Sequence, residues 1–151
     1  MSVEANKAVC RRFYEDVFNR GDLDAAAAII APPVADEAPV PEGARRPSPA
    51  GIRRLAERFR SAFPDLHFTI DWQLAEGDMV ATHWTFCGTH RGTYTTPRAT
   101  VPPTGRRVTW RGAHTFRLAA GQIVQEWLTV DGMALLEQLG ATVTVPNTSA
   151  S

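Results

Sequence analysis

Two alternating runs of residues, at 109–118 and 123–130, constrain the fold of this chain more than any other feature. In the first run Trp110, His114 and Phe116 share one face, while threonine, arginine and alanine residues occupy the other. Alternation with a period of two is typical of a strand with one covered face. The sequence Ala-Ala-Gly between the runs permits a tight turn, because glycine tolerates positive φ. We therefore predict a β-hairpin with His114 on its covered face.

The second run adds an acidic residue to the same environment. In a regular strand Val124, Glu126, Leu128 and Val130 lie on one side. If this side faces inward, Glu126 and His114 share an apolar enclosure. An imidazole has an ordinary pKa of ~6.5, and burial raises the pKa of a carboxyl. Both groups can therefore move protons near neutral pH. This pair is the strongest chemical clue in the sequence.

The composition excludes several classes of function. The chain has 151 residues, 44% of them apolar, and 16 basic residues balance 16 acidic ones. It therefore has the composition of a globular protein, without the basic stripe that nucleic-acid binding requires. Two cysteines are too few for a disulfide scaffold, and neither a membrane span nor a signal-peptide core is evident. We expect a cytoplasmic protein with a single domain over 1–140 and a flexible tail at 141–151.

Helical periodicity and strand alternation divide the rest of the chain into helices first and strands second. This order predicts an α+β fold, in which a strongly curved antiparallel sheet wraps round the N-terminal helices as a cone-shaped barrel with a pocket. Asp131 is expected to cap a short last helix. The predicted helices are at 4–20, 23–30, 49–63 and 132–139. Strands are expected at 67–74 and 80–87, joined by a turn at 76–78. An extended piece is expected near 34–37 and a long loop at 91–105.

Aromatic residues on the predicted inward strand faces line the pocket or fill the core. Trp84 and Trp110 are able to stack on a flat or polyene substrate, although plain packing explains them equally well. Tyr14, on the first helix, is a candidate to point its hydroxyl at a ligand, with core packing as the alternative. The predicted inward aromatic residues of the strands are Phe68, Trp72, Trp84, Phe86, Trp110 and Phe116.

Several short stretches follow one another in a characteristic order over residues 4–140. They are Asn6-Lys7-Ala8, Phe13-Tyr14-Glu15, Phe18-Asn19-Arg20-Gly21-Asp22-Leu23-Asp24, Ala62-Phe63-Pro64-Asp65-Leu66, Glu76-Gly77-Asp78, Gly88-Thr89-His90, Pro102-Pro103-Thr104-Gly105-Arg106-Arg107 and Gln138-Leu139-Gly140. No single stretch is specific, but the ordered set resembles the SnoaL-like polyketide cyclases of the NTF2-like superfamily.

The resemblance implies a hydrophobic pocket in an α+β cone, a homodimer, and neither a metal nor an organic cofactor. The best-known cyclases of this family close a ring of a polyketide-derived substrate by intramolecular aldol chemistry. The superfamily also holds isomerases, epoxide hydrolases, dehydratases and proteins without catalysis. In the cyclases an Asp on the last long strand acts as general acid/base, helped by a His on the strand before it, and that His position matches His114 here.

Three departures from the family pattern stand out. The position of the Asp falls on Leu128, directly after Trp127, and leucine cannot move a proton. The segment 94–101 is longer than the family's usual link, and Glu37 stands where many relatives have a His. We therefore expect a substrate different from that of the aromatic cyclases.

We interpret His114 as the first catalytic candidate and Glu126 as its acidic partner. A structural ion pair with an arginine, or a strand end in solvent, is the alternative for Glu126. No spacing of His and carboxylate residues indicates a metal site. Substrate contacts are expected from Tyr14, Glu37, Trp84, Trp110, Phe116, Leu128 and Asp131, the last being most simply a helix cap.

The predicted function is that of a cofactor-free cyclase or isomerase acting on a hydrophobic polyketide-like intermediate of secondary metabolism. Much of the rate gain is expected from holding a flexible substrate folded. Epoxide opening, Michael-type addition or a pericyclic step survives the loss of the Asp better than aldol condensation. Two alternatives stay open: a non-catalytic binder of a hydrophobic metabolite, and an accessory protein to a hydroxylation step.

Overall fold

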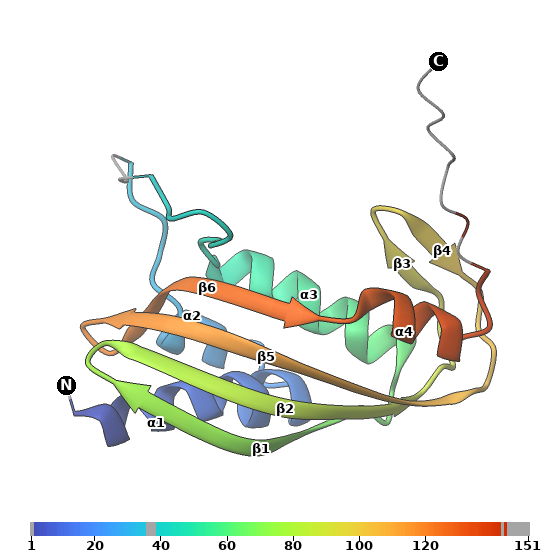
Figure 1. Cartoon of the computed structure of the whole chain (residues 1–151), viewed down its shortest axis with the longest axis horizontal. Helices are drawn as coiled ribbons and strands as arrows, with labels where there is room; N and C mark the ends of the chain where they lie inside the picture. The colour runs from blue at the N-terminus through green and yellow to red at the C-terminus, as the bar shows by residue number, and fades with distance from the viewer. Residues whose placement is uncertain (1, 36–38, 143, 145–151) are drawn as a thin grey trace.

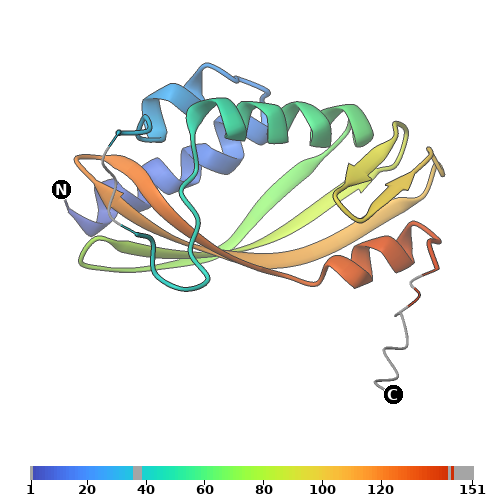
Figure 2. The same ribbon diagram turned by 90° about the horizontal axis from the view of Figure 1, so that it is seen from above.

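A curved antiparallel sheet carries the N-terminal helices on one face (Figure 1, Figure 2). The computed structural model describes residues 2–35, 39–142 and 144. The sheet has the strand order β1-β2-β5-β6, and the small β3–β4 hairpin stands with α4 at one end of it. The elements are α1 (Val3–Arg12), η1 (Phe13–Asn19), α2 (Ala25–Ile29), α3 (Pro49–Ala62), β1 (His67–Glu76), β2 (Met79–Thr89), β3 (Tyr94–Thr96), β4 (Ala99–Val101), β5 (Arg107–Ala119), β6 (Gln122–Val130) and α4 (Gly132–Gln138).

The predicted α+β fold, with a curved antiparallel sheet round N-terminal helices, is confirmed. The sheet does not close into a complete barrel, because its edge strands β1 and β6 do not pair with each other in the described part of the chain. Along the β6 edge, Ile30 and Arg45 form single bridges to Ile123 and Glu126. The segment between α2 and α3 therefore extends the sheet on the side of the predicted site.

The first predicted helix consists of two segments of different geometry. Ser2 caps α1 by accepting a hydrogen bond from the Ala5 amide at 3.1 Å, and at Phe13 the chain passes into the π-helix η1. π-Helical turns are rare and concentrate at functional sites. The Asn19 side chain donates to the Phe68 carbonyl at 2.9 Å and accepts from the Phe68 amide at 2.7 Å. These two bonds fix the end of η1 against β1.

Side-chain caps mark the starts of α3 and α4, and the Asp131 cap predicted from the sequence is present. The Ser48 hydroxyl accepts from the Gly51 amide at 3.0 Å at the start of α3, and the Asp131 carboxylate accepts from the Ala134 amide at 2.9 Å at the start of α4. Gly140 follows α4 with a φ of 79°, a conformation that favours glycine. Both helices thus begin at the residues that their sequences indicate.

A bulge in β1 moves Trp72 to the outer face of the sheet. Ile70 pairs with Trp84 but Trp72 pairs with His83, so Asp71 is an extra residue in the strand. Such a bulge bends the strand and reverses the alternation of faces beyond it. Trp72 is 49% exposed and stacks on His83, with the ring centroids 5.2 Å apart. The prediction that Trp72 faces inward is therefore wrong, and Trp72 lies with His83 outside the core.

The register of β5 and β6 also shifts once, close to the turn that joins them. Leu118 pairs with Ile123, so Ile123 is buried and Val124 is half-buried. This reverses the assignment expected for a regular strand, because one extra residue moves the alternation by one face. Further along, Phe116 pairs with Glu126, which lies on the inward face as predicted.

One prediction about an irregular segment needs correction. The segment 91–105 contains the β3–β4 hairpin, so the long loop expected there is wrong. Near 34–37, the described residues 34 and 35 belong to no strand, and positions 36–38 lie outside the described residues. In the expected tail, the Ala141 amide donates to the Leu136 carbonyl at 3.0 Å, whereas positions 143 and 145–151 lie outside the described residues.

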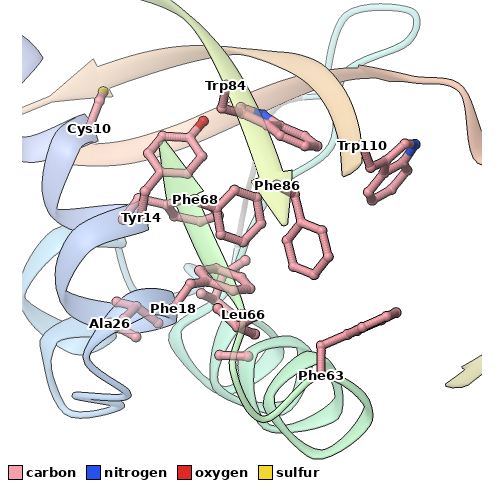
Figure 3. Close-up of a cluster of buried hydrophobic side chains, with 14 of the residues drawn as sticks. Cys10, Tyr14, Phe18, Ala26, Phe63, Leu66, Phe68, Trp84, Phe86 and Trp110 are labelled. Carbon is pink, nitrogen blue, oxygen red and sulfur yellow. The ribbon is translucent and has the colours of Figure 1, made fainter. Parts of the chain in front are cut away.

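Aromatic side chains fill the space between the helices and the sheet (Figure 3). Phe68 is central to this cluster: its ring centroid lies 5.1 to 5.6 Å from those of Tyr14, Phe18, Trp84 and Phe86. Tyr14 from η1 and Trp84 from β2 turn their polar atoms toward one another (Figure 3). The core therefore places two hydrogen-bonding groups inside an otherwise apolar wall.

Gly112 leaves space that the Trp84 indole occupies. A Cβ atom at position 112 would lie 2.5 Å from Trp84 Cζ2 and 2.6 Å from Val130 Cγ1. We predict that Gly112→Ala lowers the free energy of unfolding by about 1–3 kcal/mol, as overpacking of a core does. Gly132→Ala is the matched control, because nothing lies within 4 Å of its added Cβ. Urea unfolding compares the two variants, and equal stabilities would contradict this packing.

Candidate functional site

His114 lies on the inward face of β5, enclosed by side chains from the sheet and from η1. The residue is 7% exposed. Its cross-strand partners are Thr82 of β2 and Leu128 of β6. The imidazole stacks on Phe116 with centroids 5.0 Å apart and planes at 10°, and Phe13 covers it from the helix side at 5.4 Å. The side chain therefore sits where the sheet meets the helices.

Both hydrogen bonds of the His114 ring converge on one nitrogen. The Tyr14 hydroxyl lies 2.8 Å from Nδ1, and the Trp84 indole donates to the same atom at 3.0 Å. An indole N–H can only donate, so Nδ1 is the acceptor and the proton of the neutral ring is on Nε2. Nε2 has no hydrogen-bond partner in the described part of the chain, and it is not among the enclosed unpaired atoms there. It is thus the ring atom open to a ligand.

Burial keeps this imidazole uncharged. Desolvation, aided by the positive charge of Arg45, lowers the pKa of His114 to about 3. A ring with this pKa is neutral at physiological pH and accepts a proton poorly. It can still donate a hydrogen bond through Nε2–H to a developing negative charge, as the groups of an oxyanion hole do. The geometry therefore favours polarisation of a ligand oxygen over the proton transfer that the sequence suggested for His114.

Glu126 is buried on the same inward face, beside Arg45. It is 7% exposed, and it exchanges backbone hydrogen bonds of 2.8 and 2.9 Å with Arg45. The Arg45 Nη2 atom lies 3.5 Å from Glu126 Oε1. Burial raises the pKa of Glu126, and Arg45 opposes the rise. The ion pair considered as the alternative is present, while the raised pKa keeps the carboxyl suited to proton exchange.

Sequence reasoning missed two residues that contact this site. Arg45 lies in a proline- and charge-rich segment without periodicity, and its pairing with β6 joins positions far apart in the chain, so no local signal marks it. Thr82 did carry a signal: it is a polar residue at an inward position of an alternating apolar run. The structure buries it completely, directly across from His114.

A groove of about 890 Å³ opens between the β3–β4 hairpin and α4. Its lining includes Tyr94 and Arg98 of the hairpin, Trp110 of β5, and Met133 and Leu136 of α4. A volume of this size accommodates a ligand of several rings. Its walls are largely apolar, with one arginine at the hairpin.

Strands β5 and β6 connect this groove with the site around the imidazole. Val130 lines the groove and pairs with Gly112, whereas Leu128 pairs with His114 one same-face step further along β6. Such a step spans ~6.6–7 Å. Leu128 is 37% exposed on this face. Neither Leu128 nor His114 lines the groove itself, whose lining on β6 ends at Val130.

The predicted substrate contacts fall into two groups. Tyr14, Trp84 and Phe116 are enclosed around His114 and hold the imidazole from the protein side. Trp110 lines the groove, and its indole donates to the Asp131 carbonyl at 2.7 Å. The Asp131 carboxylate serves as the cap of α4, so its expected contribution at the pocket rim stays a prediction.

Two further sequence predictions have different outcomes. Glu37, expected at the pocket mouth, lies outside the described residues. The sequence also places His90, just after the strand expected at 80–87, at the surface or in a turn; the structure buries it fully, so this interpretation is wrong. Its ring packs on Phe63 with centroids 5.4 Å apart, and its Nδ1 accepts from the Thr104 amide at 3.2 Å. The imidazole is inside because it satisfies the backbone of the segment before β5.

The described residues offer neither a metal centre nor a membrane-spanning helix. No three His, Cys, Asp or Glu side chains lie there in an arrangement that could hold a metal ion. Among the same residues, none of the helices has the length and apolar character needed to cross a membrane.

The curved sheet with the helices on its inner face is the fold of the NTF2-like class of proteins. A sequence profile of the family described as SnoaL-like polyketide cyclase matches residues 8–139. The chain therefore belongs to the SnoaL-like polyketide cyclase family.

Solved structures show the same fold. AclR from Streptomyces galilaeus, a proposed hydroxylase, is 30% identical, with a TM-score of 0.72 over 97% of this chain and 87% of its own. IdmH from Streptomyces antibioticus, a proposed polyketide cyclase, is also 30% identical, with a TM-score of 0.67 over 90% and 99%. TsrD from Streptomyces laurentii is 25% identical, with a TM-score of 0.77 over 94% and 99%. The comparison with curated proteins gave no match.

His114 gives the stability of this protein a defined pH dependence. Its folded-state pKa of about 3 lies below the ordinary value of 6.5, so the unfolded chain binds the proton first as the pH falls. The stabilisation is complete above pH 6.5 and is lost as the pH falls toward 3. Between pH 6.5 and about 5 we predict a loss of about 2 kcal/mol from this group. Glu126, with its raised pKa, acts in the opposite sense.

Urea unfolding at several pH values between 7 and 5 tests this expectation on the wild type and His114→Gln. The variant should lose less stability than the wild type over this range, since glutamine does not titrate. His90 is common to both proteins and cancels in the comparison. Parallel pH profiles would show that His114 does not titrate as its burial requires.

Proposed function

We propose that this protein is a cofactor-free cyclase or isomerase that folds a hydrophobic polyketide-like intermediate in its pocket. The family supports the class of reaction, and the groove beside α4 supports an apolar ligand of several rings. Holding a flexible chain in one folded conformation supplies a large part of the rate gain in such a reaction. The observation that carries the proposal is the single open nitrogen of His114, on the same strand as Trp110, which lines the groove.

In this proposal His114 donates its Nε2 hydrogen to a substrate oxygen that gains negative charge during ring closure. Tyr14 and Trp84 hold the other nitrogen, so the donor is already oriented before the substrate binds. Glu126 is the group that takes up or delivers a proton, because burial raises its pKa. Leu128 occupies the place of the family's acid and supplies apolar contact only. Ring closures that need one polarised oxygen fit this arrangement better than an aldol condensation.

One observation favours a second candidate, a non-catalytic binder of a hydrophobic metabolite. Leu128 is partly exposed beside His114, so apolar surface faces the ligand where the cyclases carry an acid. A protein of this kind would bind candidate compounds without converting them. The similarity to AclR supports a third candidate, an accessory role in hydroxylation, which would show as a strict requirement for a partner enzyme and a nicotinamide.

His114→Ala should lower turnover at least about tenfold, since it removes the donor aimed at the substrate oxygen. His83→Ala is the matched control, because His83 lies on the outer face of the sheet and should leave turnover unchanged. The assay follows conversion of a panel of linear and partly cyclised polyketide intermediates by mass spectrometry. Circular dichroism verifies that both variants fold. Unaltered turnover by folded His114→Ala would remove the catalytic assignment, and binding without conversion by the wild type would support the binder.

We further propose a homodimer formed through the outer face of the sheet. Trp72 is 49% exposed there and Leu74 is 65% exposed, so this face offers apolar surface to a second copy. Trp72→Arg should shift the protein toward the monomer in light scattering. Val3→Arg, on the exposed side of α1, should not. A monomeric wild type at micromolar concentration would contradict the proposal.

A further inference from the structure

We infer that the groove between the β3–β4 hairpin and α4 binds a ligand that carries a carboxylate group, and that Arg98 is the specificity-determining residue that recognises this group. The inference rests on the proposed function, because it names the class of substrate that the groove would accept, a hydrophobic polyketide-like acid. Binding of such an acid can be measured without any conversion of the ligand.

The groove offers a ligand mostly apolar surface. The hairpin and α4 stand at the same end of the sheet (Figure 2), with Trp110 of β5 in the lining between them. The Trp110 indole N–H is already donated to the Asp131 carbonyl at 2.7 Å, so the ring presents apolar surface only. Met133 on α4 is 50% exposed. Further apolar lining comes from Pro97, Val130 and Leu136. A ligand that fits these walls therefore has a hydrophobic body.

Arg98 is the only charged side chain among the described residues that line this groove. It is exposed, and its guanidinium makes neither a hydrogen bond nor an ion pair within the described part of the chain. The planar fork of N–H groups in a guanidinium matches the two oxygens of a carboxylate. One positive charge in an otherwise uncharged lining balances a single negative charge, which suits a carboxylate better than a phosphate dianion.

The turn that carries Arg98 is restrained before any ligand binds. The Thr96 hydroxyl oxygen accepts from the Arg98 amide at 3.2 Å and from the Ala99 amide at 3.0 Å, and the hydroxyl donates to the Ala99 carbonyl at 3.3 Å. Pro97, the second residue of the turn, has its φ fixed by its ring. Only the side chain of Arg98 then has to be ordered by a ligand, which lowers the entropic cost of binding.

A pair of fluorescent probes that differ only in charge tests the inference on the whole protein. Anthracene-2-carboxylate and the neutral anthracene-2-carboxamide share three fused rings. We expect the acid to bind roughly threefold to tenfold more tightly than the amide at low salt. High salt should reduce this preference, because it screens an exposed charge. Equal affinities of the two probes, or no binding of either up to its solubility limit, would overturn the inference.

Arg98→Gln removes the charge, and we expect it to abolish the preference by weakening the acid while leaving the amide unchanged. Arg54→Gln is the matched control, because it removes the same charge from α3, where Arg54 lines a separate hollow. This control should bind both probes as the wild type does. A preference that persists in Arg98→Gln, or that is lost equally in Arg54→Gln, would contradict the assignment of Arg98.

Methionine signals locate the probes on the protein. The chain has three methionines, and Met133 lines the groove, whereas Met79 lies on β2 outside it. In a spectrum of protein labelled with carbon-13 in the methionine methyl groups, Met133→Leu identifies the Met133 signal. We expect both probes to shift this signal and to leave that of Met79 in place. An unshifted Met133 signal at saturation would place the probes outside the groove and overturn the inference.

Failure of this inference and failure of the proposed function give different results. An acid preference that depends on Arg98, together with full turnover by folded His114→Ala, would refute the catalytic assignment of His114 and leave the carboxylate site intact. Loss of turnover in His114→Ala, together with equal binding of acid and amide by the wild type, would refute the carboxylate site and leave the proposed function intact.

Discussion

The rest of this structure depends on the two hydrogen bonds that meet at His114 Nδ1. One comes from η1 through Tyr14 and the other from β2 through Trp84, so the bonds tie the helix layer to the sheet at the site itself. Other features serve this contact. The hydrogen bonds between Asn19 and the Phe68 backbone hold the π-helix, and with it Tyr14, against the sheet. Because Gly112 has no side chain, the Trp84 indole can occupy the space above it.

Burial shifts the pKa values of the two ionisable groups of the site, His114 and Glu126, in opposite directions. It lowers the pKa of His114 and raises that of Glu126, so both tend toward the neutral form. A neutral imidazole with one occupied nitrogen is a fixed donor, whereas a carboxyl with a raised pKa can still exchange a proton. Arg45 lowers both pKa values and limits the change at Glu126. In the proposed mechanism the different roles of the two groups therefore follow from desolvation, which lowers one pKa and raises the other.

The sequence predicted the features that repeat and missed those that interrupt a repeat. Alternation located the hairpin and the inward positions of His114 and Glu126, because strands bury every second residue. It failed at Trp72 and Val124, since a single extra residue reverses the faces and leaves no mark in composition. Arg45 reaches the site by pairing with a distant strand, which no local pattern encodes. The tautomer of His114 likewise needed the three-dimensional neighbours of Nδ1 to be known.

A crystal structure with a bound polyketide-like ligand tests most directly whether His114 is a donor to the substrate. The structure described here predicts a ligand oxygen within about 2.7–3.1 Å of His114 Nε2, with the apolar part of the ligand lying along Leu128 toward the groove. A ligand that occupies the groove while His114 Nε2 contacts no ligand atom would contradict this role for the imidazole.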